Sequence, residues 1–207
     1  MWIYFSSPFV TTQLLRPLEV ATIHRLALLP ALSICFSLMF TGCVTLTGKN
    51  ASLRTPGELI DDQFLESVAR RAIRSADERL KSAHVVVVSY NGILLLAGQV
   101  ESEELRQTAQ RAVEHLKNVR RVHNELSVGG PISWLARSND SWLTSKVKAK
   151  LIAAGDVSAS EIKVITENSV VYLLGKVSRQ EADRAVEIVR NTFGVQKIVK
   201  IFDYLTT

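Results

Sequence analysis

The sequence predicts an α+β protein built from two tandem copies of one small module, each ordered helix, strand, strand, helix, strand. The first observation behind this prediction is an internal repeat, whose offset falls only from 78 (Asp62 and Asp140) to 76 (Val122 and Ile198). The others are a pair of apolar strands joined by a turn signal in each copy, and periodic helical segments around them. Self-similarity at a fixed offset is strong evidence of modular architecture, and duplicated small modules favour binding surfaces over a catalytic cleft.

The first element of the first copy is an amphipathic helix. Leu65, Ala69, Ile73 and Ala76 recur every three or four residues, which predicts one apolar stripe on a helix over 62–80. The charged side chains of this segment fall mostly on its other faces. We therefore expect this helix to pack on a sheet.

A hairpin follows this helix. The run 84–89 is rich in β-branched residues, Asn91-Gly92 is a strong signal for a two-residue turn, and 93–100 continues as a second apolar strand. Ser102, followed by two glutamates, then predicts a helix N-terminus, with a hydroxyl cap and acidic residues near the positive end of the dipole. That helix runs to about Leu116, and 119–128 supplies the last strand.

The second copy repeats this order. We expect helices over 140–153 and 178–193, and strands over 162–166, 170–177 and 195–204. Each copy is then an αββαβ module with a three-stranded sheet covered on one face by two helices. Because both strands of each hairpin are largely apolar, we also expect part of the second sheet face to be covered where the modules meet.

The N-terminal segment is predicted to be a signal peptide over 1–42. The 17 residues from Leu26 to Gly42 carry no charge and stand immediately before Cys43, a length that suits a secretory apolar core. Residues 1–19 extend it without a clear basic region, so initiation is expected nearer Val20. Residues 43–60 are short, polar-leaning and broken by glycine and proline, which predicts a flexible tether.

The tetrapeptide Phe40-Thr-Gly-Cys43 resembles the bacterial lipobox. That resemblance implies that Cys43 is diacylated, with palmitate-type chains, and becomes the mature N-terminus. It also implies sorting to the outer membrane, because Val44 stands where an aspartate would signal retention in the inner membrane. Since Cys35 would leave with the leader, the mature chain would have no disulfide.

The two copies resemble the BON domain, and two BON repeats behind a lipobox resemble the DolP (YraP) class of outer-membrane lipoproteins. The resemblance rests on Ser138–Val147, Val164–Asn168, Asn118–Leu126 and the strand-closing glycines Gly98 and Gly175. It gives a first BON domain over 61–128, a linker over 129–138 and a second BON domain over 139–207. The first module departs from the family pattern at Asn118, where the family tends to carry glycine before the final strand.

Catalytic motifs are absent from the sequence. No metalloprotease, paired-cysteine, nucleophile-elbow, phosphate-loop or dinucleotide pattern occurs, and the histidines at 84, 115 and 123 have no metal-ligand spacing. We therefore expect a protein that is not an enzyme and needs no cofactor or metal. A sequence pI near 9.4 could suggest nucleic acid, but a secreted lipoprotein rarely meets it, and no basic-aromatic platform or recognition helix is evident. We therefore expect envelope phospholipid, and not nucleic acid, as the anionic partner.

A candidate lipid-binding surface lies on the first helix of the second module. Leu143, Val147 and Leu151 repeat at helical spacing and must face the core, which turns an adjacent flank of the helix outward. The candidate residues on and beside that flank are Trp142, Ser145, Lys146, Ala149 and Lys150. Tryptophan beside lysines suits an anionic bilayer, because indole prefers headgroup depth and lysine is attracted to the charged surface. The alternative is that Trp142 packs against the linker or the other module.

The linker itself contains Ile132, Trp134 and Leu135, which are too apolar for a free segment. We expect these side chains to dock between the modules. The alternative is that Trp134 extends the lipid-binding surface beside Trp142.

These observations predict a lipoprotein on the periplasmic face of the outer membrane that binds anionic phospholipids, phosphatidylglycerol or cardiolipin, through its second BON domain. The family resemblance implies a role in envelope integrity and recruitment to division sites. The alternative is a protein adaptor that contacts outer-membrane assembly or quality-control proteins. In the repeat, Phe64 and Val68 of the first module stand where the second has Trp142 and Lys146, so the first module is expected to serve as spacer, support or protein contact.

Overall fold

The computed structural model describes residues 55–130 and 133–205, and both modules belong to one compact unit. The first module contains α2 (Pro56–Ala76), α3 (Arg79–Ser82), β1 (His84–Tyr90), β2 (Ile93–Val100), α4 (Glu103–Glu114) and β3 (Arg121–Val128). The second contains α5 (Trp134–Ala154), a short 3₁₀ turn (Ala159–Glu161), β4 (Ile162–Glu167), β5 (Val170–Val177), α6 (Arg179–Arg190) and β6 (Lys197–Tyr204). The predicted repeat of αββαβ modules is confirmed.

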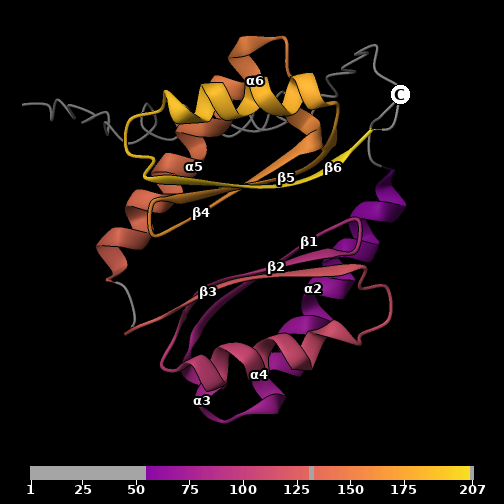
Figure 1. The fold of residues 1–207 in the computed structure, drawn as a ribbon, viewed down its shortest axis with the longest axis vertical. Coiled ribbons are helices and arrows are strands. Elements are labelled where there is room, and N and C mark those ends of the chain that lie inside the picture. Colours follow the sequence, from indigo (N-terminus) through magenta and orange to yellow (C-terminus); the bar gives the residue numbers. More distant parts are fainter. Residues whose placement is uncertain (1–54, 131–132, 206–207) are drawn as a thin grey trace, which may run out of the picture. The chain divides into compact units, whose positions relative to one another are not determined.

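Each module has one three-stranded sheet with its hairpin at one edge. The strand orders are β1-β2-β3 and β4-β5-β6, with the hairpin strands antiparallel and the last two strands parallel. A parallel pair needs a crossover, which α4 and α6 provide. In each module both long helices lie on the same side of the sheet (Figure 1). The predicted one-sided helical layer is confirmed.

The hairpin turns have positive φ at both central residues, at Asn91 (48°) and Gly92 (73°), and at Asn168 (50°) and Ser169 (62°). This geometry matches the right-handed twist of the strands, and asparagine and glycine adopt it at low cost. A second left-handed position precedes the last strand.

This second position is occupied by Asn118 (71°) in the first module and by Gly194 (104°) in the second. Asparagine tolerates the left-handed region because its short polar side chain hydrogen-bonds locally. The departure at Asn118 therefore keeps the turn that glycine makes elsewhere.

The first helix of each module begins before the predicted start. Thr55 caps α2 in a capping box with Glu58, and Ser133 caps α5 by accepting a hydrogen bond from the Ala136 amide. Capping residues are polar and lie outside the apolar periodicity, so the periodicity alone placed the starts too late. The segments predicted as tether and linker thus supply the first turns of α2 and α5.

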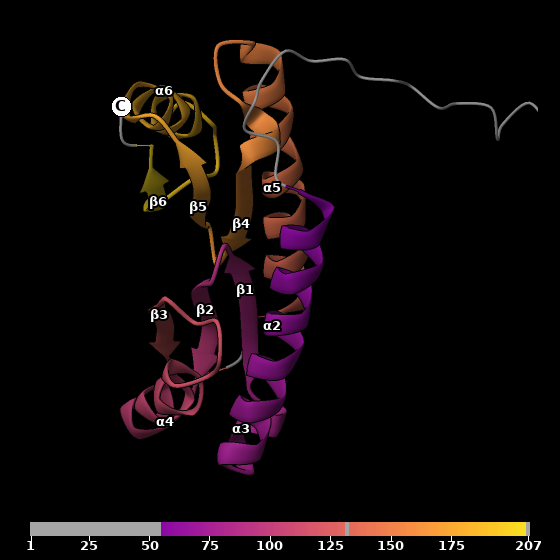
Figure 2. The same ribbon diagram turned by 90° about the vertical axis from the view of Figure 1, so that its right-hand side faces the viewer.

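The end of the first helix also differs from the prediction. The helix expected over 62–80 stops at Ala76, because Asp77 has extended backbone angles and accepts from the Arg79 amide. The short helix α3 then follows at the C-terminal end of α2 (Figure 2).

Each module has its own hydrophobic core between helices and sheet. In the second module Leu143, Val147 and Leu151 of α5 meet Leu173 of β5 and Ala185 of α6. The equivalent positions of the first module form a second cluster of the same kind. Burying such side chains contributes about 1.5–3 kcal/mol each, so helix and sheet stabilise one another.

The second face of each sheet is also buried. A third cluster joins residues of both modules, namely Val88, Tyr90, Ile93, Leu95, Ala97, Tyr172, Leu174 and Ile201. Alternate residues of β2 therefore point to different cores, with Leu94 and Leu96 toward the helices and Leu95 toward the other module. This confirms the expectation that the modules meet through their apolar sheet faces.

Polar contacts reinforce this interface. The Tyr90 hydroxyl donates to the Glu161 carbonyl (3.0 Å) and accepts from the Lys176 amide (3.1 Å). Lys163 Nζ lies 2.7 Å from Glu66 Oε1, an ion pair between the modules. Because Tyr90 is buried, its hydroxyl needs these partners.

Candidate functional site

Helix α5 turns Trp142 away from the core. Leu143, Val147 and Leu151 are buried, and Trp142, on the opposite flank, keeps 66% of its surface exposed. The alternative, in which Trp142 packs against the linker or the first module, is therefore wrong. Ser145, Ala149 and Lys150 are exposed as well, whereas Lys146 is half-buried.

The two lysines of this flank reach the C-terminal end of α6. Lys146 Nζ lies 3.4 Å from the Phe193 carbonyl oxygen, and Lys150 Nζ lies 2.9 Å from that of Asn191. Cations are favourable at a helix C-terminus, because its last carbonyls carry partial negative charge. The lysines thus join α5 to the turn that follows α6.

Phe193 is a residue of this surface that the sequence analysis did not single out. Its side chain is 92% exposed, in the turn between α6 and β6. The Lys146 ammonium lies 5.9 Å from the centroids of both the Trp142 and Phe193 rings, within cation–π range. Phe193 was predicted at the end of a helix over 178–193, but α6 ends at Arg190, and the aromatic residue directly before Gly194 was the one local signal for it.

The two apolar residues that begin α5 do not dock between the modules. Trp134 is 74% exposed and Leu135 is 70% exposed, so the prediction that they pack at the module interface is wrong. They lie in the first turn of α5, and neither belongs to any of the three buried apolar clusters of the described residues. On a helix with 3.6 residues per turn, Leu135 is rotated about 20° from Trp142 and Trp134 about 80°. Leu135 therefore continues the Trp142 stripe more closely.

The other sequence predictions for this site concern the leader and the tether. Cys43 lies outside the described residues. None of the helices in 55–130 and 133–205 is long and apolar enough to cross a bilayer. Within the same residues, no cluster of histidine, cysteine or acidic side chains has the arrangement of a metal site.

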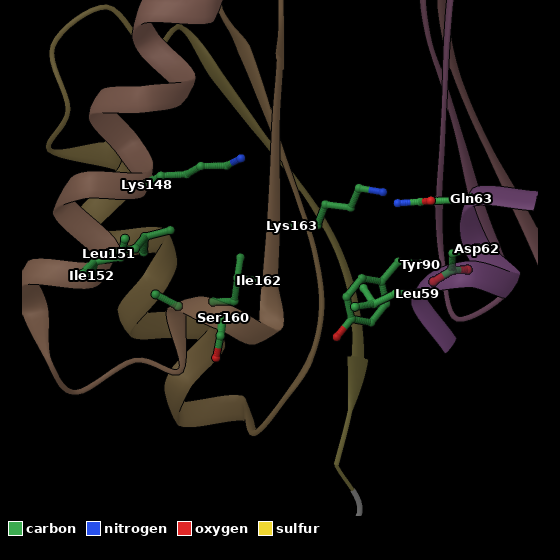
Figure 3. A pocket seen from close by; sticks show the side chains of 11 residues that line it. Leu59, Asp62, Gln63, Tyr90, Lys148, Leu151, Ile152, Ser160, Ile162 and Lys163 are labelled. Atoms are coloured by element: carbon green, nitrogen blue, oxygen red, sulfur yellow. The ribbon is translucent and has the colours of Figure 1, made fainter. Parts of the chain in front are cut away.

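A groove of about 430 Å³ lies at the boundary of the two modules (Figure 3). Leu59 and Tyr90 line it from the first module, and Lys148, Ile152 and Ile162 from the second. Two of its polar groups are used structurally, since the Tyr90 hydroxyl and the Lys163 ammonium hold the modules together. The groove is thus a seam with an apolar lining and a basic rim.

Comparison with known proteins identifies the repeat. A family model described as the BON domain matches residues 61–130 and again residues 139–205. The chain belongs to the BON-domain family. The Trp142 surface lies on the first helix of its second BON domain, and Phe193 lies in the turn before the last strand of the same domain.

Three curated relatives cover most of this BON protein. It is 41% identical to the outer membrane lipoprotein DolP of Haemophilus influenzae, over 73% of this chain and 79% of the relative. It is 39% identical to the 21 kDa hemolysin of Actinobacillus pleuropneumoniae, over 73% and 78%. It is 29% identical to osmotically-inducible protein Y of Escherichia coli, over 72% and 75%. The predicted resemblance to dual-BON proteins of the DolP class is confirmed.

Among solved structures, the BON repeats resemble the C-terminal domain of CdsD, a type III secretion protein of Chlamydia trachomatis. The match covers 66% of this chain and 96% of the other, with 12% identity and a TM-score of 0.29. A likeness of this size supports no conclusion about function.

Proposed function

We propose that this protein is a non-enzymatic envelope lipoprotein, anchored through Cys43 on the periplasmic face of the outer membrane, whose second BON domain binds anionic phospholipids. The lipobox-like Phe40–Cys43 segment and the outer membrane lipoprotein among its relatives support the location. The lipid-binding residues are Trp142, Ser145, Lys146, Ala149 and Lys150 of α5, with Trp134 at the helix start. Envelope integrity is the physiological role.

The observation that carries this proposal is the exposure of Trp142 beside Lys146. A tryptophan with two thirds of its surface in solvent has no partner to bury it in the free protein. At a bilayer, its indole would sit at headgroup depth, and each lysine near the surface would contribute about 1 kcal/mol of attraction to anionic lipid. Phosphatidylglycerol and cardiolipin supply that negative charge.

The tether keeps this surface near the membrane. Eleven residues separate Cys43 from the cap of α2 at Thr55. If this segment is the flexible tether that the sequence predicts, it would span about 20 Å, and an acylated Cys43 would hold the folded unit at high effective concentration beside the bilayer. A weak surface then suffices to orient the unit, and enrichment at division sites follows where anionic lipids gather.

Binding of the chain without its acyl anchor to vesicles tests the proposal. Residues 44–207 should bind vesicles containing phosphatidylglycerol and ignore vesicles of neutral phosphatidylcholine. Trp142→Ala combined with Lys146→Glu should abolish the binding. Phe64→Ala is the matched control, because Phe64 occupies the equivalent position of α2 and is equally exposed, at 67%.

Equal binding to neutral and anionic vesicles would contradict the proposal. Full binding by the double variant would contradict it as well. If Phe64→Ala lowered vesicle binding as much as the double variant does, the membrane contact would instead belong to both BON domains.

A second candidate function, a protein adaptor, is favoured by the groove between the modules. Its apolar lining includes Leu59 and Ile152, both exposed, and Lys148 adds a positive charge suited to an acidic peptide. Outer-membrane assembly or quality-control proteins would be its partners. Cross-linking from position 152 in cells should then recover one protein, with a yield that Trp142→Ala does not change.

A further inference from the structure

Phe193 occupies a turn that α5 holds in place. A Cβ atom added at the next residue, Gly194, would lie 3.5 Å from Leu143 Cδ1, at van der Waals contact, so the turn passes beside α5. Thr192, on the other side of Phe193, is buried and donates a hydrogen bond to the Ile188 carbonyl at 3.0 Å. Thr192 therefore anchors one side of the turn in the protein, whereas Gly194 is exposed and the Phe193 side chain lies almost wholly in solvent.

Lys146 links this ring to Trp142. Its ammonium lies 5.9 Å from each ring centroid and 3.4 Å from the Phe193 carbonyl oxygen. A cation between two aromatic rings attracts both of them. The hydrogen bond from the Lys146 ammonium to the Phe193 carbonyl oxygen also restrains the position of the ammonium relative to the turn. Two aromatic side chains from separate elements are thus presented as a pair.

The first BON domain lacks every member of this arrangement. At the equivalent positions it has Phe64 for Trp142, Val68 for Lys146, Ala72 for Lys150 and Lys117 for Phe193. A charged residue at the turn is the ordinary choice for an exposed site. An exposed phenylalanine in the second domain leaves a large apolar surface in water without any gain in core packing.

We propose that Phe193 is a second membrane-inserting side chain, and that Lys146 is the positioning residue that holds it beside Trp142. This inference rests on the proposed function, since it takes the bilayer as the ligand of this surface. Two rings in separate elements give the domain two points of insertion. A single tryptophan would leave the domain free to rotate about one contact, whereas two points fix its orientation on the membrane.

A tryptophan reporter at position 193 tests the insertion directly. Trp134 and Trp142, the two tryptophans of residues 43–207, are replaced by phenylalanine, and Phe193→Trp is added. The acylated protein is then reconstituted in phosphatidylglycerol vesicles whose acyl chains carry bromine. We expect a blue-shifted emission that bromine quenches, and neither change in neutral vesicles.

A parallel reporter separates this inference from the proposed function. Here only Trp134 is replaced, so that Trp142 is the sole tryptophan of residues 43–207. Quenching of Trp142 without quenching of the Phe193→Trp reporter would overturn the insertion of Phe193 and leave the proposed function standing. If neither reporter is quenched, both proposals fail.

The positioning role of Lys146 has its own matched control. Lys146→Met and Lys150→Met each remove one positive charge, but only Lys146 contacts Phe193. Lys146→Met should reduce the quenching of the Phe193→Trp reporter, Lys150→Met should preserve it, and Lys146→Arg should restore it. Equal reductions by the two methionine variants would show that the lysines act only as charges, and would overturn the positioning role.

Discussion

Asp62 and Asp140 make the same contact in the two modules. The Asp62 carboxylate accepts hydrogen bonds from the Asn91 and Gly92 amides, at 2.9 and 3.4 Å. The Asp140 carboxylate accepts from the Asn168 and Ser169 amides, at 2.7 and 2.9 Å. In both modules a buried carboxylate on the first helix thus fixes the hairpin turn, whose amides would otherwise lack partners.

Removal of this carboxylate should destabilise the second module. Asp140→Ala leaves two turn amides without their acceptor, so the free energy of unfolding in urea should fall by about 1–3 kcal/mol. Asp140→Asn keeps one acceptor oxygen and should cost less. The exposed Asp183→Ala should change stability by less than about 0.5 kcal/mol. Equal stabilities for the Asp140→Ala and Asp183→Ala variants would refute the role of the carboxylate.

Gly98 should tolerate no side chain. A Cβ atom there would lie 2.0 Å from the His84 carbonyl oxygen, and φ is +116°, outside the range of other residues. We expect Gly98→Ala to lower the free energy of unfolding by more than about 2 kcal/mol, because the antiparallel pairing of β1 and β2 must shift. A Cβ atom added at Gly129 would have no neighbour within 4 Å, so Gly129→Ala serves as the control. Thermal unfolding of the two variants measures the difference, and similar melting temperatures would contradict this account.

The Tyr90 hydroxyl should couple the two modules. Tyr90→Phe removes the group to which the Lys176 amide donates, across the module interface. The loss of this part-buried hydrogen bond should cost about 0.5–1.5 kcal/mol, and the ring itself still fills its place. Hydrogen exchange should therefore accelerate at the Lys176 amide. An unchanged exchange rate would mean that this bond does not persist in solution.

Stability should depend on pH through His123. Burial, chiefly, and the neighbouring Arg121 lower the pKa of His123 below its ordinary value, and Glu125 opposes them. The unfolded chain then takes up a proton at a higher pH than the folded chain does. The stabilisation is thus complete above about pH 6.5 and is lost as the pH falls toward the lower folded pKa.

Replacement of His123 isolates this contribution. Its Nε2 atom is buried and makes no hydrogen bond within the part of the chain that the structure describes, so protonation would add an unpaired charge. His123→Gln should flatten the loss of stability in urea unfolding between about pH 7 and 5.5. His115→Gln, at an exposed site, should keep the wild-type slope. A His123→Gln variant with that same slope would disprove the assignment.

Local signals predicted most of the fold. The spacing of Leu65, Ala69 and Ile73 placed the core face of α2, and the strand β2 was predicted with its observed bounds. These features depend on side chains only a few positions apart in the chain, so the apolar pattern of the sequence is enough to predict them. Helix starts were harder, because the caps Thr55 and Ser133 lie outside the apolar pattern.

The candidate site was predicted in part. The exposure of Trp142 followed from the helical period, since Leu143 had to be buried. The role of Phe193 did not follow, because it lies 47 residues from its contact Lys146, and no local pattern brings the two together. Trp134 was placed wrongly for a related reason, since its apolar character says nothing about whether a neighbouring surface exists.

The sequence by itself determined the repeat, the order of the elements and the apolar face of each helix, because side-chain periodicity acts over one or two turns of chain. The tertiary structure decided which distant groups meet, as Asp140 meets the turn at Asn168 and Tyr90 meets Glu161. Those contacts depend on strand register and on crossover connections, which bring together segments that lie far apart in the sequence. The exposed pair of Trp142 and Phe193 is of this second kind, since only the packing of α6 on α5 places the two rings around one lysine.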